Sequence, residues 1–167
     1  MCDHRTPEFS EEHAQLDQAV LNIMFDVERQ RPWSTSEIAR MLSTPGHVPA
    51  SIERLRTAGL IHCWGDLASA SHPSVRFFEL SQGEDGACAE EHHTESAVLE
   101  GVLARTGGRG RWVPELKIHR AFGAKKNERK LAITDALSSL DASGLIERRS
   151  GHVMASEVAR RLDEMML

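Results

Sequence analysis

The sequence has few cysteines and no long apolar run. Cys2, Cys63 and Cys88 are scattered and odd in number, which does not suit a disulfide framework and fits a reducing compartment. No window approaches 18 consecutive apolar residues, so no membrane-spanning helix is expected. The first residues, MCDHRTPEFSEEH, are polar and acidic and lack the apolar segment of a secretory signal. We therefore expect a cytoplasmic protein.

Motifs for catalysis are also missing. The chain contains no GxSxG, HExxH, P-loop or GxGxxG pattern. The segment 107–111 is glycine-rich, but no β-type run precedes it and it lacks the P-loop lysine, so a connector is favoured over phosphate contact by Arg109 and Arg111. Cys88 lies near His92 and His93, as Cys2 lies near His4, yet structural zinc usually needs four ligands in paired spacing. We expect no enzyme activity, no metal and no cofactor.

What the chain does contain is one seven-residue pattern written twice. LRTAGLI at 55–61 has a near-twin in LDASGLI at 140–146. In this pattern the first leucine is the last core contact of a helix, and the glycine takes a turn with positive φ. The Leu-Ile pair then starts a strand that packs back beneath the helix. Two copies predict two units of the same plan.

The first half has the elements of such a unit. Leu16, Val20, Ile23, Met24 and Val27 recur at helical spacing and predict a first helix. Ser34 and Glu37 form a capping-box pattern before a second helix with Ile38, Met41 and Leu42. Pro49 suits the start of a third helix, which carries Ile52 and Leu55 inward and ends at Gly59. Residues 60–64 and 75–80 are β-type runs around a polar loop and predict a hairpin.

The second half follows the same order. Its predicted first helix carries Val98, Leu99, Val102 and Leu103. Trp112 precedes a second helix as Trp33 precedes its counterpart. The third helix, 128–143, buries Ile133, Leu137 and Leu140 before Gly144, and a hairpin turns at Ser150-Gly151. The glycine-rich acidic stretch between the halves looks like a linker.

The two Gly-Leu-Ile endings, the capped helix of residues 34–42 and the short Ser150-Gly151 wing resemble the winged helix–turn–helix superfamily, in tandem. The resemblance covers most of the chain. It implies a mainly α (α+β) protein of two winged-helix domains, each with three helices and a short β-hairpin. We predict domains at 14–82 and 95–167, joined by a linker at 83–94. MarR- and PadR-like regulators share this unit, and segregation-and-condensation protein B carries two.

Charge is distributed unevenly between the halves. The chain has a net charge of −5, and residues 96–167 carry 13 basic and 9 acidic side chains, net +4. All the lysines, Lys117, Lys125, Lys126 and Lys130, lie in this last part. A polyanion would therefore be attracted to the C-terminal half.

The predicted third helices give a mixed signal for DNA binding. The first turns Ala50, Glu53, Arg54 and Thr57 outward, and the second turns Glu128, Leu131, Asp135 and Ser138 outward. Carboxylates on this face repel phosphates. Basic residues gather instead at the start of the second of these helices and on its wing, where phosphates can be bound. The predicted DNA contacts are Lys125, Lys126, Arg129, Lys130, Arg148 and Arg149, with Arg54 on the N-terminal third helix and His152 beside the wing.

Two functions remain open at this stage. The resemblance implies a DNA-binding transcriptional regulator that uses its C-terminal unit on double-stranded DNA. The alternative is a protein-interaction scaffold, for which the outward Leu131 is an argument. A last helix capped by Ser156 carries Val158, Leu162, Met165 and Met166 along one face, and this face could pack on its own domain or form a homodimer.

Overall fold

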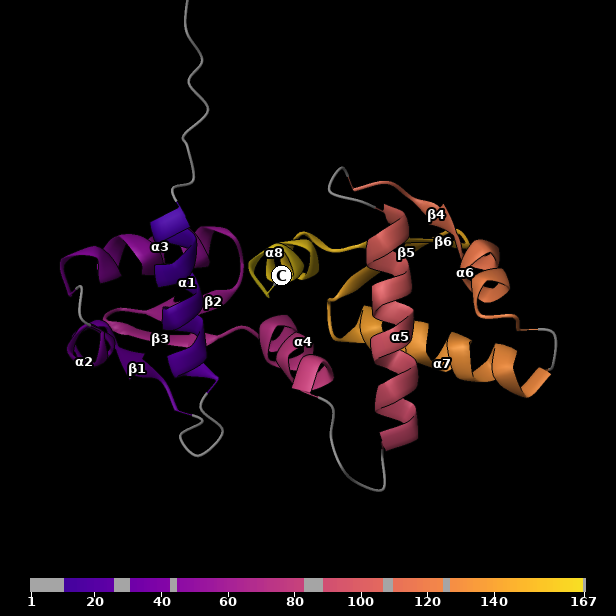
Figure 1. Cartoon of the computed structure of the whole chain (residues 1–167), viewed down its shortest axis with the longest axis horizontal. Coiled ribbons are helices and arrows are strands. Elements are labelled where there is room, and N and C mark those ends of the chain that lie inside the picture. Colours follow the sequence, from indigo (N-terminus) through magenta and orange to yellow (C-terminus); the bar gives the residue numbers. More distant parts are fainter. Residues whose placement is uncertain are drawn as a thin grey trace, which may run out of the picture. The chain divides into compact units, whose positions relative to one another are not determined.

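A computed structural model describes residues 11–25, 31–42, 45–82, 89–106, 110–124 and 127–166. The described chain is mainly helical, with two small three-stranded antiparallel sheets (Figure 1). It divides into two compact units, Met1–Ala70 and Ser71–Met165, which we call the N-terminal and C-terminal units. Among the described residues, no helix is long and apolar enough to cross a bilayer.

The N-terminal unit places three helices around one small sheet. Its elements are α1 (Glu11–Met24), β1 (Trp33–Ser34), α2 (Thr35–Met41), the 3-10 helix η2 (Pro45–His47), α3 (Val48–Thr57), β2 (Ile61–Trp64) and β3 (Leu67–Ala70). β3 lies between β1 and β2 and is antiparallel to both. The core is formed by apolar side chains from the three α-helices, the three strands and the turn after α3, namely Val20, Leu21, Met24, Trp33, Ile38, Val48, Leu55, Leu60, Ile61 and Ala68.

The C-terminal unit has more helix around a sheet of the same design. Its elements are α4 (His72–Gln82), α5 (Ala89–Thr106), β4 (Val113–Pro114), α6 (Glu115–Ala121), α7 (Asn127–Ala142), β5 (Ile146–Arg149), β6 (His152–Ala155) and α8 (Glu157–Met166). β6 lies between β4 and β5. The largest buried side chains of this unit come from α6, α7, the turn after α7, β5 and α8, namely Ile118, Leu137, Leu140, Leu145, Ile146 and Leu162.

The seven-residue pattern makes the same helix-to-strand turn in both units. The N–H of Leu60 donates to the carbonyl of Leu55 at 2.9 Å, and the N–H of Leu145 donates to the carbonyl of Leu140 at 3.0 Å. The intervening Gly59 and Gly144 have φ of 73° and 76°. A bond of this span with a left-handed glycine is the Schellman termination of a helix, so the predicted role of both glycines is confirmed.

The correspondence continues beyond this pattern. Cys63 faces Ala68 across the first hairpin, and Arg148 faces Val153 across the second. A serine follows each hairpin and precedes the next helix: the N–H of Val75 donates to the Ser71 carbonyl, and the N–H of Arg160 donates to the Ser156 carbonyl. α4 is therefore the sequence counterpart of α8. Both halves run through the order helix, strand, helix, helix, strand, strand, helix.

Two predictions about local structure are wrong. Residues 75–80 are not a strand but part of α4, because the second strand of the first hairpin is the closer Leu67–Ala70. The counterpart of Trp33 is Val113, since both pair with the middle strand of their sheet, and Trp112 is left 38% exposed. Within the predicted linker, residues 89–94 form the first turns of α5, whereas 83–88 lie outside the described residues.

Candidate nucleic-acid interface

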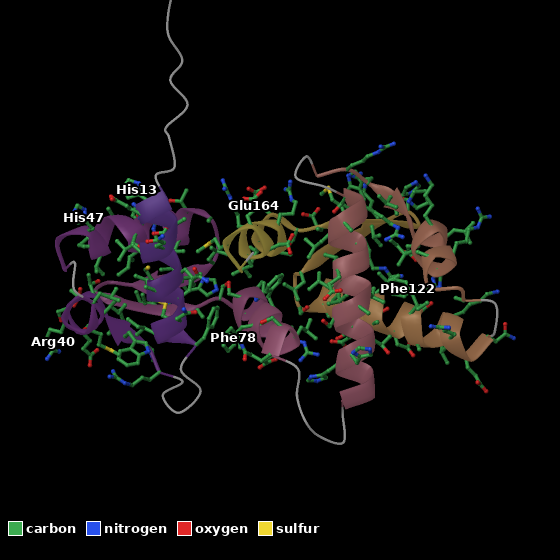
Figure 2. All side chains as sticks on the ribbon, in the orientation of Figure 1. His13, Arg40, His47, Phe78, Phe122 and Glu164 are labelled. Carbon is green, nitrogen blue, oxygen red and sulfur yellow. The ribbon has the colours of Figure 1, made fainter. Side chains whose placement is uncertain are left out.

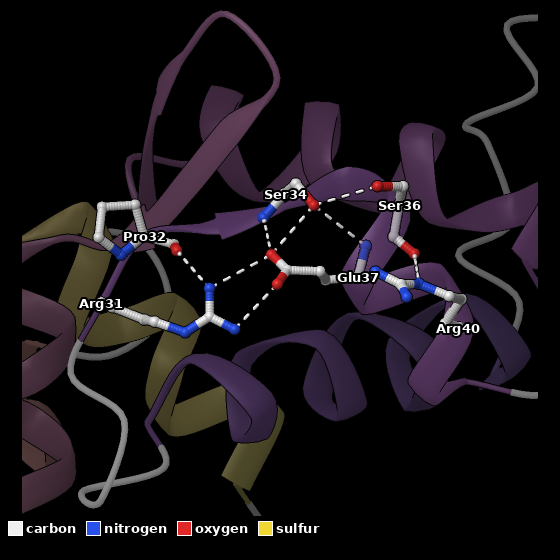
Figure 3. Close-up of polar contacts among 6 residues, drawn as sticks. All are labelled: Arg31, Pro32, Ser34, Ser36, Glu37 and Arg40. Atoms are coloured by element: carbon white, nitrogen blue, oxygen red, sulfur yellow. Dashed lines mark hydrogen bonds and ion pairs between the residues drawn. The ribbon is translucent and has the colours of Figure 1, made fainter.

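The described arginines of the N-terminal unit form ion pairs or hydrogen bonds with other groups of their own chain. Arg31 forms an ion pair with Glu37 at 2.9 Å, and Arg56 forms one with Glu53. Figure 3 shows the first pair beside the capping box of α2, where Arg40 also donates to the Ser36 carbonyl. Arg54 donates to both carboxylate oxygens of Asp17, at 3.0 and 2.6 Å. These four are all the arginines that the structure describes in this unit. Each of the four guanidinium groups therefore has a partner within the chain.

The Asp17–Arg54 pair explains why an arginine on α3 turns away from solvent. Asp17, on α1, is 5% exposed and also accepts a hydrogen bond from Ser51 of α3. A buried carboxylate needs such partners because removing it from water is costly. Arg54 and Ser51 therefore join α3 to α1, and the predicted DNA contact at Arg54 is already committed to this pair.

The C-terminal unit, whose described side chains Figure 2 draws as sticks, differs because many of its cations are exposed and form no ion pair with a described residue. Within the described part of the chain, no ion pair engages Arg111, Lys117, Arg120, Arg129, Lys130 or Arg149, and all six are exposed. They lie on the segment before β4, on α6, on the first turn of α7 and on β5. Lys117 and Arg120 were not among the predicted contacts. The sequence does contain a sign of their exposure, because Ile118 is the buried apolar residue of α6 and these two cations point away from it into solvent.

The hairpin β5–β6, which we call the C-terminal wing, is fixed against α6 and α7. Arg148 donates to both oxygens of Glu115, at 3.0 and 3.2 Å, and to Ser138 at 2.8 Å. The N–H of Glu115 donates to the carbonyl of Gly151 in the wing turn at 2.9 Å. Hydrogen bonding to Glu115 raises the pKa of Arg148 above its usual value. Arg148 is thus a positioning residue that joins the wing to both helices.

The predicted contacts therefore have different environments. Arg129, Lys130 and Arg149 are exposed, and His152 is exposed with its Nδ1 3.1 Å from the Ser150 carbonyl. Arg148 and Arg54 are paired as described above. Lys125, Lys126 and Arg109 lie outside the described residues.

The outward face of α7 is as the sequence predicts. Glu128, Leu131, Asp135 and Ser138 are all exposed, and Leu131 is 63% exposed. Ile133, Leu137 and Leu140 on the opposite side are buried. Ser138 is engaged by Arg148, whereas no hydrogen bond or ion pair joins Glu128 or Asp135 to any described residue. Cations and carboxylates are thus mixed on this surface, since Glu128 stands beside Arg129 and Lys130 at the start of α7 and Asp135 lies farther along the helix.

The wing of the N-terminal unit has a different surface. Trp64 and Leu67 are cross-strand partners at its tip, 59% and 42% exposed. The ring of His62 lies 6.0 Å from that of Trp64, centroid to centroid. Trp64 and Leu67 correspond to Arg149 and His152 in the C-terminal wing. The same hairpin is therefore apolar in one unit and basic in the other.

Other candidate sites find less support. No group of three or more His, Cys, Asp or Glu residues that could hold a metal ion occurs in the described ranges, and Cys2, His4 and Cys88 fall outside them. Burial raises the pKa of the Cys63 thiol, which disfavours a reactive thiolate. On α8, Leu162 of the predicted dimerisation face is 1% exposed, so this residue is already packed within its own chain.

Comparison with known protein families, with characterised proteins and with solved structures finds no match to this chain.

Proposed function

We propose that both units are winged helix–turn–helix domains and that the C-terminal one binds double-stranded DNA. The sequence resemblance supports the fold, and so does the repeated element order, in which a β-hairpin follows α3 in one half of the chain and α7 in the other. The observation that carries the function is the distribution of free cations. Those without a partner among the described residues gather in the C-terminal unit, whereas the described N-terminal arginines are neutralised or bound to backbone.

The proposed contact is mainly to phosphates. Exposed cations on α6, on the first turn of α7 and on the wing can each neutralise one phosphate. Lys125 and Lys126, directly before α7, are proposed to join Arg129, Lys130 and Arg149. The role of Arg148 in this assembly is to hold the wing, since its guanidinium is occupied by Glu115. The protein would act as a cytoplasmic regulator.

The test is a titration of a fluorescent random-sequence duplex at several salt concentrations. Counterion release predicts a log–log slope of about −0.9 per neutralised phosphate. Binding that weakens steeply with salt supports the proposal. A titration with no salt-sensitive binding to any duplex would reject it.

A second candidate function rests on the exposed Trp64–Leu67 pair. Aromatic side chains are enriched at protein interfaces, and the first wing presents one where the second presents Arg149. On this alternative the chain is a non-enzymatic scaffold that holds a protein partner by the N-terminal wing. Trp64→Ser would then abolish partner capture, whereas the double variant Arg129→Ala/Lys130→Ala would leave it intact.

A further inference from the structure

The two sheets begin with the same strand-to-helix step but carry different charges beside it. β1 runs directly into α2, and β4 runs directly into α6. Counted from the first residue of these strands, Glu37 of α2 corresponds to Lys117 of α6. Arg31, which precedes β1, corresponds in the same way to Arg111. The guanidinium of Arg31 is held by Glu37 at 2.9 Å, whereas Arg111 has a lysine in the place of that carboxylate.

The start of α6 accommodates a lysine at this position for a local reason. In α2, Glu37 also caps the helix by accepting a hydrogen bond from the backbone N–H of Ser34. The corresponding N-cap of α6 is Pro114, which has no N–H to satisfy and makes no side-chain cap hydrogen bond. Position 117 therefore has no capping role, and Lys117 is exposed.

An accessible indole stands beside these cations. Trp112 directly follows Arg111 in the chain and is 38% exposed. Arg111 and Lys117 are both exposed and form no ion pair with any residue of the described ranges. We call Arg111, Trp112 and Lys117 the β4-edge cluster, since β4 is an edge strand of its sheet. It combines two uncompensated cations with an aromatic ring.

The carboxylates on and beside this sheet do not neutralise the cluster. Glu115, the nearest in the sequence, accepts from Nε and Nη2 of Arg148 at 3.0 and 3.2 Å. Glu147 is exposed, but it lies on β5, which is the opposite edge strand from β4 and is about 10 Å away at ordinary strand spacing. An anionic ligand is therefore attracted to the β4 edge of the sheet.

We propose that the β4-edge cluster binds single-stranded nucleic acid, with Arg111 and Lys117 on one phosphate and the indole of Trp112 stacked on an adjacent base. Since Arg31 and Glu37 meet at 2.9 Å, side chains at the corresponding positions can reach a common phosphate. Two cations at that spacing repel each other, and a phosphate between them removes the repulsion.

Stacking selects an unpaired strand rather than a duplex. Every base has a π-face, so an aromatic ring can stack on a strand of any sequence. In a duplex, neighbouring base pairs cover both faces of each base and leave no place for an indole. The inference therefore goes beyond the proposed duplex binding and concerns a different ligand and a different set of residues.

Fluorescence anisotropy of a labelled oligothymidylate, titrated with the full chain, tests the inference. Trp112→Ala should weaken binding by about five- to 150-fold, the range that one stacked base supplies. Trp112→Phe keeps a ring and should bind close to wild type. Trp64→Ala is the matched control, because Trp64 is 59% exposed on the other sheet and the described arginines of its unit are engaged. This variant should bind as wild type does.

An abasic oligomer of the same length separates stacking from charge. It keeps the phosphates and lacks the bases, so it should bind the wild-type chain more weakly than oligothymidylate does. Trp112→Ala should not weaken its binding further. Equal affinity of the wild-type chain for both oligomers would exclude stacking, even if Trp112→Ala failed to fold.

The charge reversal gives a second test. Lys117→Glu restores the arrangement of the N-terminal unit, in which a carboxylate occupies the arginine, and should weaken oligothymidylate binding more than Lys117→Ala does. Arg120→Glu makes a similar change of charge at another exposed position of α6 and should have a smaller effect. Equal losses from Lys117→Glu and Arg120→Glu would mean that the net charge of α6, and not the cluster, attracts the strand.

The remaining outcomes distinguish this inference from the proposed function. Neither contact involves the 2′-hydroxyl group, so oligouridylate should bind as oligothymidylate does, and binding of only one of them would overturn the site. Absence of binding to both, or binding that a folded Trp112→Ala protein retains in full, would also overturn it. Trp112→Ala should keep salt-sensitive duplex binding, whereas Arg129→Ala/Lys130→Ala should weaken duplex binding and keep that of oligothymidylate. A chain that binds oligothymidylate but no duplex would reject the proposed function and leave this inference standing.

Discussion

Glu37 belongs to the capping box at the start of α2, and its neighbours lower the pKa of its carboxyl group. It accepts from Arg31, from the backbone N–H of Ser34 and from the Ser34 hydroxyl, and Ser34 accepts from the N–H of Glu37 in return (Figure 3). Arg31 also lies over the ring of Trp33, 4.3 Å from its centroid. These contacts, that of Arg31 first, lower the pKa of Glu37 from 4.5 to about 2.

A pH dependence follows with a definite sign. A carboxyl whose pKa is lower in the folded state stabilises it above the unfolded pKa, and this stabilisation is lost as pH falls from about 4.5 through about 2. Glu37→Gln should therefore melt below wild type at pH 6, and the difference should shrink towards pH 2. Glu12→Gln, at an exposed position on α1, is the control. Melting curves from pH 2 to 6 measure both, and a difference that stays constant with pH would refute the expectation.

Arg148 and Arg149 are neighbours in the sequence, but we assign a structural role to Arg148 and a phosphate contact to Arg149. Arg148 is 24% exposed and paired with Glu115, whereas Arg149 is exposed and has no ion pair among the described residues. Arg148→Ala should lower the free energy of unfolding by about 1 kcal/mol, because Glu115 loses its partner. Arg149→Ala should leave stability within about 0.5 kcal/mol and flatten the salt slope of DNA binding by about one. Denaturant unfolding and salt titration of both variants measure these effects. A loss of stability in Arg149→Ala together with a flatter salt slope in Arg148→Ala would contradict the two roles.

At the scale of the element, α7 carries one leucine on its buried face and one on its exposed face, so the same substitution can be compared at both. Leu140 is fully buried and Leu131 is 63% exposed on the same helix. Leu140→Ala should cost about 2–5 kcal/mol through lost contacts and a cavity, as should Leu55→Ala in the N-terminal unit. Leu131→Ala should change stability by less than about 0.5 kcal/mol. Chemical denaturation gives these differences, and a melting curve unchanged by Leu140→Ala would mean that the two patterns are not equivalent.

The glycine at the end of α7 gives a separate prediction. Gly144 has φ of +76°, and a Cβ placed on it would lie 3.2 Å from Cγ of Pro73. Gly144→Val should destabilise the chain, because a β-branched residue is strained at positive φ and also meets this ring. Gly123→Ala is a useful comparison, since it has φ of +59° with open space around its Cβ and tests the backbone effect alone. Thermal unfolding in which Gly144→Val melts no lower than Gly123→Ala would argue against a role for the contact with Pro73.

The sequence predicts these helix ends well because their cause is local. A leucine, a glycine and the next leucine define a hydrogen bond that spans six residues, so the pattern contains all the information required. α4 was missed for the opposite reason. Its core, with Val75, Phe77 and Phe78, has β-type composition, and the burial of Phe77 and Leu80 in the C-terminal unit decides its helical state. The one local feature that indicated a helix was Ser71, which precedes α4 as Ser156 precedes α8.

The same distinction applies to the candidate site. Exposed positions on α7 follow from helical periodicity, and the structure agrees for all four outward residues. The ion-pair partner of an arginine cannot be predicted from helical periodicity. Arg54 finds Asp17 and Arg148 finds Glu115 across long stretches of chain, so both appeared free in the sequence. Two of the predicted contacts are therefore held in long-range ion pairs, whereas Lys117 and Arg120, which were not predicted, are exposed and form no ion pair among the described residues.

At the scale of the whole chain, the two halves share an element order and differ in the charge of their described surfaces. Wild-type binding should draw on the C-terminal unit alone, so Lys125→Ala/Lys126→Ala should weaken it for every sequence and flatten the salt slope by roughly two. Arg54→Ala should leave the slope unchanged while lowering stability, because Asp17 stays buried without its cation. Salt titrations below the melting midpoint of each variant separate the two effects. A folded Arg54→Ala protein that no longer binds, beside a double lysine variant that binds normally, would place the DNA contact on the N-terminal unit instead.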